Sequence, residues 1–401
     1  MRFTIKAIPS RAGNVGKIQL NNPAALNALD LDMVRAMNDI LPTYSNLKAT
    51  IFLSSSNDNE DVDDSKKKKR NAFCAGGDVK SVYMAGMGLN GREEDINAKK
   101  LNQHGFGCRN IYTADFFREE YELNHKIATQ LSTTPQISIW DGVVMGGGVG
   151  ISVHGKYRIA TENSLFAMPE TNIGLFPDVG GTYFLPRLKG GIGAYIGLTG
   201  ARLRADDLLY GGIATHYIKS ENIPEMITEL EKKSVEEFDK LGDCAASVLM
   251  SFHEDPGQNQ SFLAQNRELI DQTFKGKETV EDIIIALENL GSESKFGINT
   301  LETLKKMSPT SLKVTLEGIR RGKELPNIAE CLRMEFRMSQ AFMREGSDFY
   351  EGIRALLVDK DNKPKWKISK LEDVSDELVK SFFNNLGEEE LDFEVPSGSK
   401  L

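Results

Sequence analysis

Cysteine is scarce in this sequence, and so is every arrangement of it that marks a metal or disulfide site. The 401 residues include four cysteines, which stand far apart, without a CxxC pair or a cysteine–histidine spacing typical of zinc ligands. The pattern is typical of an intracellular protein with reduced thiols, and it predicts no metal site. We interpret Cys74 as a packing residue, because no histidine stands near it, and His154 and His216 as structural residues.

Long apolar runs and an excess of basic residues are also missing. No segment approaches the roughly 18 uninterrupted apolar residues of a membrane span. The formal net charge of −9 argues against a general nucleic-acid binder, which would normally be basic. We therefore expect neither a membrane nor a nucleic acid as a partner. The apolar content of 40% is sufficient for a core, and the length allows two or three domains or one large domain with an appendage.

The two ends of the chain differ in their targeting signals. The N-terminus begins directly with a strand-like alternation and has neither a long apolar region nor a presequence rich in arginine and serine. The chain ends on Ser399, Lys400 and Leu401, which match the peroxisomal import signal and follow a polar segment. The expected location is therefore the peroxisome, with the import receptor as a partner.

Glycine, in contrast, is abundant in one central stretch, Trp140–Pro186. Val143–Met145 is predicted to be a short buried strand that ends at three consecutive glycines. Consecutive glycines are unfavourable inside a helix or strand, and they suit a place where backbone N–H groups must come close to a ligand. The apolar residues 149–153 predict the start of a buried helix, and a helix N-terminus after a strand favours an anion or oxyanion.

Two isolated carboxylates, Glu170 and Asp178, stand among the apolar residues of the same stretch. Residues 164–168 form an apolar run that is predicted to be a strand, and Glu170 follows this run almost at once. A charge buried without a partner costs several kcal/mol, so a carboxylate in this position indicates a function.

The N-terminal third of the sequence predicts an α/β arrangement. Strands are expected over residues 16–20 and 49–53, and an amphipathic helix over 27–44. Residues 55–70 interrupt the pattern with a run of acids followed by a run of bases. This segment could be a nuclear-type basic patch, but we favour a solvated insertion whose charges cancel.

The segment after the insertion is predicted to resume the fold. Residues 71–80 combine an apolar strand end, a glycine turn and Asp78, an aspartate suited to cap the next helix. Residues 84–114 lack periodicity and predict a long loop or lid, whereas residues 116–131 have the apolar spacing of a helix.

The remainder of the chain is predicted to be mostly helical. The expected helices span residues 191–198, 222–241, 280–290, 301–307, 311–321, 328–343, 348–357 and 371–386, and one more is expected to start over 202–208 and to end at Gly211 and Gly212. We therefore expect a core over residues 1–222, a helical C-terminal region over 223–386 and a flexible tail over 387–401. A polar region at 254–278 separates two of the helices.

The motifs assembled so far resemble the crotonase, or enoyl-CoA hydratase/isomerase, superfamily. The segments that carry the general resemblance are Leu20–Pro23, Asn27–Leu29, Phe73–Lys80 and Met145–Gly148. Five more look most like its 3-hydroxyisobutyryl-CoA hydrolase branch, namely Phe117–Tyr121, Met168–Glu170, Leu175–Gly181, Met307–Lys313 and Asp348–Ala355. The resemblance implies an α/β fold, a crotonase-like spiral of ββα units with a helical C-terminal region, and an acyl-CoA thioester substrate.

The resemblance also implies roles for individual residues. The backbone N–H groups of Gly77 and Gly147 would form the oxyanion hole, and glycine lets the backbone approach the thioester oxygen closely. Glu170 would act as nucleophile or as general base, an alternative that the sequence leaves open. Asp178 would orient the reacting groups or supply a proton, and Glu120 would bind the 3-hydroxyl end of the substrate.

One position argues for hydrolysis over hydration. The hydratases of the superfamily carry a glutamate in the short helix after the glycines, where this sequence has Gly150. Hydration uses two carboxylates, and only the second, Glu170, is present here. Two alternatives stay open, a peroxisomal enoyl-CoA hydratase or isomerase, and a catalytically silent protein that binds acyl-CoA.

The resemblance bears on ligands, assembly and location as well. Coenzyme A would be part of the substrate, so no cofactor is expected, and Lys80 could reach the CoA phosphates. The superfamily often forms trimers, which leaves a homo-oligomer open. Proteins of the hydrolase branch are often mitochondrial, so the mitochondrion is the alternative location.

Overall fold

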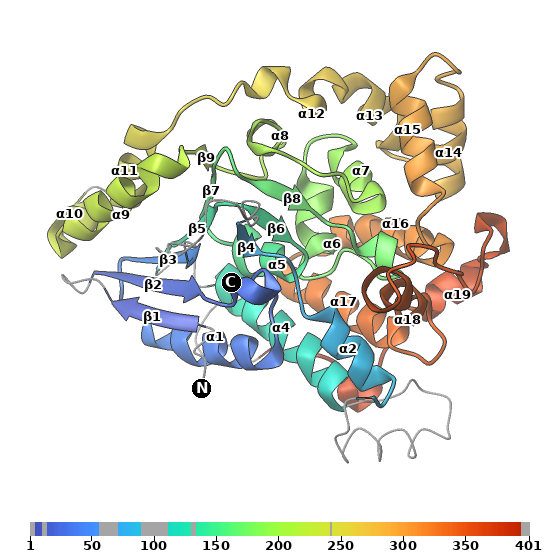
Figure 1. The fold of residues 1–401 in the computed structure, drawn as a ribbon, viewed down its shortest axis with the longest axis horizontal. Helices are drawn as coiled ribbons and strands as arrows, with labels where there is room; N and C mark the ends of the chain where they lie inside the picture. Colours follow the sequence, from blue (N-terminus) through green and yellow to red (C-terminus); the bar gives the residue numbers. More distant parts are fainter. Residues whose placement is uncertain are drawn as a thin grey trace, which may run out of the picture. The chain divides into compact units, whose positions relative to one another are not determined.

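The computed structural model describes residues 5–9, 14–55, 71–89, 111–129, 134–240 and 243–393. The chain forms two compact units, each built from three separate segments. Figure 1 labels the helices and strands and colours them by their order in the sequence. Unit 1 comprises Met1–Asp78, Lys126–Met168 and Ala201–Glu268, and unit 2 comprises Val79–His125, Pro169–Gly200 and Leu269–Leu401. The central glycine-rich stretch is thus shared between the two units.

Unit 1 contains two β-sheets. The larger sheet has six strands in the order β1 (Ile5–Pro9), β2 (Val15–Leu20), β3 (Ala49–Ser54), β5 (Gln136–Trp140), β7 (Tyr157–Ala160) and β9 (His216–Tyr217). All neighbours in it are parallel except β1 and β2. The smaller sheet consists of three parallel strands, β4 (Ala72–Cys74), β6 (Val143–Met145) and β8 (Leu165–Ala167).

Consecutive strands alternate between these two sheets. In each of the pairs β3/β4, β5/β6 and β7/β8, the first strand belongs to the larger sheet and the second to the smaller one. Helix α2 (Val79–Gly86) follows the first pair, and helix α5 (Gly147–Val153) follows the second. This repetition of ββα units confirms the predicted crotonase-like α/β fold.

The larger sheet buries one face in a hydrophobic core. Side chains from adjacent strands, such as Ile51, Ile139 and Ile159, pack in one cluster with Met226 and Leu249. The helices of this cluster are α9 (Ile223–Lys232), α10 (Val235–Lys240) and α11 (Cys244–Phe252). Each fully buried aliphatic side chain contributes about 1.5–3 kcal/mol, so this packing stabilises the sheet.

The first helix is shorter than the apolar spacing predicts. We expected a helix over residues 27–44, but α1 spans Leu31–Thr43. Asp30 caps it by accepting a hydrogen bond from the backbone N–H of Met33. Leu29 is extended and pairs with Gly77, an interaction between distant segments that local spacing cannot reveal.

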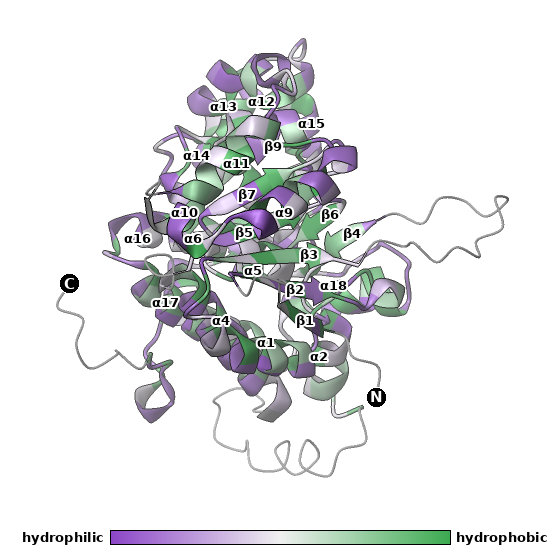
Figure 2. Cartoon of the chain, turned by 90° about the vertical axis from the view of Figure 1, so that its left-hand side faces the viewer, coloured by the Kyte–Doolittle hydropathy of each residue, from purple (hydrophilic) through white to green (hydrophobic). Residues whose placement is uncertain are grey.

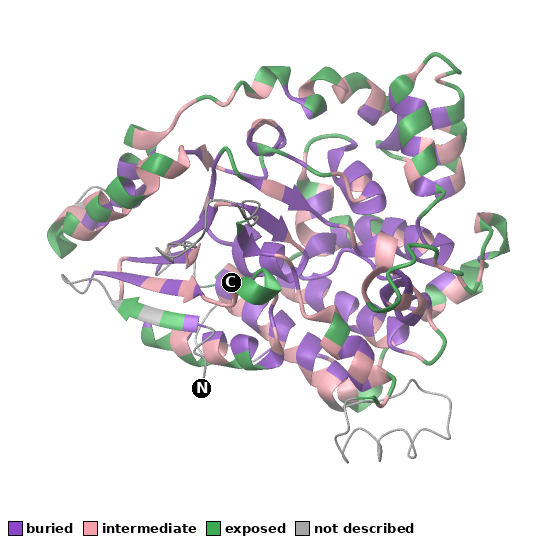
Figure 3. Cartoon of the chain, viewed as in Figure 1, coloured by how far each residue is buried: buried purple, intermediate pink, exposed green. Residues whose placement is uncertain are grey.

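Most helices described in unit 2 follow the predicted order. They are α4 (Ile111–Thr129), whose last residues belong to unit 1, α7 (Ile192–Thr199), α14 (Val280–Glu288), α16 (Pro309–Glu324), α17 (Ile328–Phe342), α18 (Asp348–Ile353) and α19 (Asp376–Ser381). Helix α6 (Gly181–Phe184) was not predicted, and the helix expected over 301–307 is α15 (Lys295–Leu304), which begins and ends earlier. The helices carry both hydrophobic and hydrophilic residues (Figure 2), as expected of elements with one buried side. Helix α5 of unit 1 is buried along its whole length (Figure 3).

Other helices differ from the predictions in extent. The helix expected over 371–386 is α-helical only over Asp376–Ser381, where Ser375 caps its start. The helix expected to start over 202–208 is α8 (Ala205–Tyr210), which starts within that range at Ala205 and ends at Gly211 as predicted. The polar region at 254–278 contains two helices, α12 (Phe262–Gln265) and α13 (Arg267–Phe274).

The expected loop and tail are described only in part. Within the predicted lid, α2 extends to Gly86 and α4 begins at Ile111, while residues 90–110 lie outside the described residues. Residues 387–393 of the predicted tail are packed, since Leu391 and Phe393 are buried and Arg118 donates to the carbonyls of Glu389 and Glu390. The charged insertion from residue 56 to residue 70 and the C-terminal Ser399–Leu401 lie outside the described part.

Within the described part of the chain, no helix is both long and apolar enough to span a bilayer.

Candidate active site

The two glycine loops of the predicted oxyanion hole lie together in unit 1. Strands β4 and β6 are parallel neighbours, so the loops that follow them leave the same edge of the smaller sheet. The two loops approach so closely that a Cβ atom on Gly148 would lie 2.4 Å from the carbonyl oxygen of Cys74. Gly76, at a φ of +111°, adopts a conformation that favours glycine. The fold therefore juxtaposes the loops of Gly77 and Gly147, as the resemblance implies.

The backbone hydrogen bonds of these loops leave two donors available. Ala75 and Asp78 donate their N–H groups to the carbonyls of Leu26 and Leu29. Gly77 and Gly147, by contrast, donate to no carbonyl group in the described part of the chain. N–H groups without an internal partner are what an oxyanion hole requires.

Glu170 is buried in unit 2, at the start of a short 3-10 helix, η3 (Glu170–Ile173). Its Oε2 atom has no hydrogen-bond partner among the described residues. The chain reaches it from β8, which ends three positions earlier in the sequence. A buried carboxylate oxygen without a partner is costly, so this atom is a candidate for contact with a substrate.

Two of the sequence motifs support the turn that carries Glu170. Ser308 donates its N–H to the carbonyl of Thr171 and its hydroxyl to Asp348. A Cβ atom on Gly352 would lie 2.3 Å from the carbonyl oxygen of Ile173, so α18 passes directly against this turn. The motifs around Ser308 and Asp348 therefore hold η3 in place.

Asp178 lies in a tight turn of unit 2. Val179, the next residue, has a φ of +53°, which is strained for a β-branched side chain. The phenol of Tyr121 donates a hydrogen bond to Asp178 Oδ2 over 2.8 Å. Asp178 is thereby held in one orientation by a residue of α4, whose neighbour in the sequence is Glu120.

A further buried carboxyl group, Glu335 on α17, stabilises this turn and was not among the predicted site residues. It accepts hydrogen bonds from the N–H of Gly180 at 2.7 Å, and from the N–H and hydroxyl of Thr182 at 2.8 and 2.6 Å. The available signal was one acidic residue on an apolar helix face, between Met334 and Phe336. Both of these neighbours are buried as well.

Burial controls the electrostatics of the carboxylates in unit 2. It raises the pKa values of Glu120 and Glu170 well above the ordinary value, and the charge of Asp178 raises both further. Burial also raises the pKa of Asp178 to about 6, although the Tyr121 hydrogen bond acts in the opposite direction. The pKa of Glu335 is raised to about 8 by burial, against the effect of its three donors. A cluster of this kind holds ionised and protonated carboxyl groups together near neutral pH, as acid–base chemistry requires.

Glu335→Gln is expected to lower the free energy of unfolding by about 1–3 kcal/mol. The NH₂ group of glutamine would face an N–H group whose hydrogen bond a carboxyl oxygen of Glu335 accepts, and that hydrogen bond would be lost. The folded-state pKa of about 8 lies above the ordinary 4.5, so the contribution of Glu335 to stability is lost as the pH rises through this range. The difference between wild type and variant should therefore shrink between about pH 5 and pH 8. Urea unfolding at several pH values measures this difference in stability, and Glu302→Gln, at an exposed position, is the control. A difference that grows with pH would contradict the raised pKa of Glu335.

The other predicted residues differ in burial, and Glu120 belongs to the carboxylate cluster. Glu120 is buried on α4, and its Oε1 atom has no partner among the described residues. Lys80 is exposed in the first turn of α2. Cys74 is fully buried, which agrees with a packing role, and His216 contacts the hydroxyl of Thr215. No group of three or more His, Cys, Asp or Glu side chains suited to a metal ion occurs in the described ranges.

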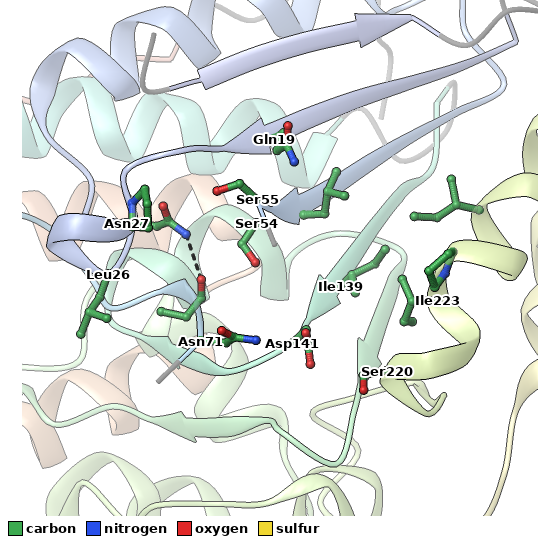
Figure 4. Close-up of a pocket in the computed structure, with 15 residues that line it drawn as sticks. Gln19, Leu26, Asn27, Ser54, Ser55, Asn71, Ile139, Asp141, Ser220 and Ile223 are labelled. Carbon is green, nitrogen blue, oxygen red and sulfur yellow. Dashed lines mark hydrogen bonds between the residues drawn. The ribbon is translucent and has the colours of Figure 1, made fainter. Parts of the chain in front are cut away.

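A separate pocket of about 270 Å³ lies in unit 1, near the carboxyl ends of β2, β3 and β5 (Figure 4). Apolar side chains such as Leu53, Ile139 and Ile223 line it together with Ser54 and the carboxamide of Asn71. Among the residues that the structure describes, neither a lysine or arginine nor any of the predicted catalytic residues lines this pocket.

Two sheets wound as ββα units, paired glycine loops and a cluster of buried carboxyl groups define the crotonase class of proteins. The chain belongs to the enoyl-CoA hydratase/isomerase family, whose model matches residues 15–383.

Several curated relatives bear the name 3-hydroxyisobutyryl-CoA hydrolase, mitochondrial. The protein of this name from Dictyostelium discoideum is 40% identical over 96% of this chain and 92% of its own length. Those from Xenopus laevis and Mus musculus are 43% and 42% identical, over 95% and 96% of this chain and 89% and 90% of their own lengths.

Solved structures extend the similarity to proteins with other names. A carnitinyl-CoA dehydratase from Mycobacterium thermoresistibile is 32% identical with a TM-score of 0.79, over 98% of this chain and 99% of the other. An enoyl-CoA hydratase from Rhodobacter sphaeroides is 31% identical with a TM-score of 0.77, over 97% of this chain and 100% of the other.

Proposed function

We propose that this protein hydrolyses a short 3-hydroxyacyl-CoA thioester, most specifically 3-hydroxyisobutyryl-CoA to 3-hydroxyisobutyrate and CoA, a step of valine breakdown. The observation that carries the proposal is the buried Glu170, with a free carboxylate oxygen, in a cluster with Asp178. The names of the relatives at 40–43% identity support the same reaction.

In the proposed mechanism, the N–H groups of Gly77 and Gly147 stabilise the negative charge that develops on the thioester oxygen, each contributing about 3–4 kcal/mol. Glu170 attacks the carbonyl carbon and expels CoA thiolate, which leaves an anhydride for water to hydrolyse. Alternatively, Glu170 takes a proton from a water molecule that attacks in its place. Asp178, with a pKa of about 6, orients the reacting groups or donates a proton to the thiolate. Glu120 binds the 3-hydroxyl group.

The two routes for Glu170 differ in where water oxygen is incorporated. A single turnover in oxygen-18 water, followed by mass spectrometry of the peptide containing Glu170, distinguishes them. Label in this carboxylate supports the anhydride, and complete absence of label assigns Glu170 as the general base.

A hydratase or isomerase is the main alternative, and the names of the two similar solved structures favour it. Against it stands Gly150, a buried residue without a side chain where the hydratases carry a glutamate. Incubation with crotonyl-CoA and with 3-hydroxyisobutyryl-CoA separates the reactions, because only a hydrolase releases free thiol. A catalytically silent protein that binds acyl-CoA would release none and convert neither substrate.

The identity of the acyl group is the most specific element of the proposed substrate. 3-Hydroxypropionyl-CoA lacks one methyl group of 3-hydroxyisobutyryl-CoA, and a methyl group in a pocket is worth only about 1–3 kcal/mol. We therefore expect activity with both, and a panel of thioesters measured by thiol release ranks them.

Asp178→Asn is expected to move the acid limb of the pH profile of kcat/KM to lower pH. Activity requires ionised Glu170, and the charge of Asp178 is one cause of the raised pKa of Glu170. Burial is the larger cause, so the midpoint should stay above the ordinary 4.5. Since the carboxyl groups interact, the midpoint belongs to the cluster as a whole. The control is Asp373→Asn, at an exposed position, whose acid limb should have the same midpoint as wild type. If the midpoint of Asp178→Asn stays in place or rises, the electrostatic coupling of Asp178 and Glu170 is contradicted.

The cofactor, location and assembly remain predictions. We propose that the reaction needs no cofactor and that the exposed Lys80 contacts the CoA phosphates. The peroxisomal location and import receptor depend on Ser399–Leu401, whereas the relatives named above are mitochondrial by name. A homo-oligomer stays open.

A further inference from the structure

Asn124 on α4 is a buried amide without a hydrogen-bond partner. Its side chain is completely inaccessible, and neither its nitrogen nor its oxygen has a partner in the described part of the chain. Buried amides in unit 1 are satisfied, as shown by Asn27, which donates to Ala72 and accepts from Asn22, and by Gln136. A buried amide without hydrogen-bond partners is destabilising, so Asn124 is expected to bind a ligand or another bound molecule.

The position of Asn124 on α4 relates it to the carboxylate cluster. It follows Glu120 by four residues, and side chains with this spacing are neighbours on one face of a helix. Glu120 interacts electrostatically with both Asp178 and Glu170, and Tyr121 is hydrogen bonded to Asp178. This face of α4 is therefore the one that faces the carboxylates within unit 2.

The unpaired atoms of Glu120 and Asn124 are complementary to a hydroxyl group. A hydroxyl group donates one hydrogen bond and accepts others, an unprotonated carboxyl oxygen can accept one, and an amide both donates and accepts. A ligand hydroxyl can donate to Glu120 Oε1 and accept from Asn124 Nδ2, which satisfies both residues at once. An amide also adds no charge to a cluster whose carboxyl groups already repel one another.

We propose that Asn124 is a substrate-binding residue that hydrogen bonds the hydroxyl group of the acyl chain and makes the site selective for hydroxylated over plain acyl thioesters. The inference rests on the proposed thioester hydrolysis and names a specificity determinant of the same site. Glu120 and Asn124 then form a two-residue clamp, with Glu120 as one partner of the hydroxyl and Asn124 as the other.

Asn124→Leu tests the inference, because leucine has a similar size and no hydrogen-bonding group. Thiol release is measured with 3-hydroxyisobutyryl-CoA and with isobutyryl-CoA, which lacks only the hydroxyl group. We expect the ratio of their kcat/KM values to fall by about ten- to a hundredfold, because a site built to bind a hydroxyl group loses its discrimination with that contact. Asn124→Ser, which keeps a polar group and is smaller, should retain part of the ratio.

The control is Leu123→Ala on the same helix, which creates a cavity beside Asn124 and should affect both substrates equally. Thermal unfolding of each variant separates a loss of fold from a loss of selectivity, and Asn124→Ser carries the test if the leucine variant does not fold. An unchanged ratio in a folded, active Asn124 variant overturns the inference and identifies the amide as a site for buried water. Absence of thiol release by the wild-type protein with either substrate instead refutes the proposed function, and with it the basis of the inference.

Discussion

Glu170→Gln is expected to lower kcat for thiol release from 3-hydroxyisobutyryl-CoA by about 10²–10⁴-fold, the usual contribution of a general base. Glutamine has the shape of the glutamate but can neither attack the carbonyl as an anion nor accept a proton from water. If Glu170 is the nucleophile, the loss should reach or exceed the upper end of this range, because no anhydride can form. KM should change much less, since the oxyanion donors and Glu120 are intact.

The same substitution should leave the fold intact or make it more stable. Burial raises the pKa of Glu170 in the folded protein, so its contribution to stability declines as the pH rises above the ordinary value for a glutamate. Glutamine does not titrate, so its contribution to stability does not depend on pH. The variant should therefore gain stability relative to wild type as the pH rises. Calorimetry at several pH values measures this trend. Exposed Glu302→Gln should retain full activity, and unchanged thiol release by Glu170→Gln would assign the chemistry to another residue.

Gly148→Ala is expected to lower kcat/KM by about 10²-fold, the effect of a displacement of about 1 Å in a catalytic group. A Cβ atom at this position would lie 2.4 Å from the backbone oxygen of Cys74, and a backbone atom cannot rotate away as a side chain can. The first turn of α5 must therefore move away from the loop after β4, and Gly147 moves with it. The overpacking should also cost about 1–3 kcal/mol of stability.

A matched control for this substitution is Gly211→Ala in the same unit. Gly211 has a φ of −71°, and the nearest atom to its added Cβ lies 3.2 Å away. This variant should lie within about 0.5 kcal/mol of wild type in stability and retain its activity. Assays of thiol release and thermal unfolding compare the two variants. Wild-type activity in a folded Gly148→Ala protein would show that the spacing of the two glycine loops does not limit catalysis.

Local patterns predicted the elements but not their ends. The strands of residues 16–20 and 49–53 and the long helices of the second half were predicted because apolar periodicity is a local property. The start of α1 was wrong by four residues, since Leu29 pairs with a loop nearly fifty positions later in the chain. The helix expected over 371–386 was too long, because apolar residues recur at helical spacing on both sides of the six residues that form α19.

The sequence by itself determined which residues could carry the chemistry. Three consecutive glycines after an apolar strand, and the isolated acids Glu170 and Asp178 among apolar neighbours, are visible without any structure. They stand out because glycine is unfavourable inside regular elements and a buried charge is costly.

Only the tertiary structure determined the hydrogen-bond partners and the pKa values of these acids. The partners of Asp178 are Tyr121, far earlier in the chain, and the turn held by Glu335, far later. Its pKa of about 6 results from burial, which raises it, and from the hydrogen bond of Tyr121, which lowers it. The tertiary structure also showed that the Asn124 amide is buried and unpaired. Burial and electrostatic coupling depend on which distant segments meet, and no local pattern in the sequence contains that information.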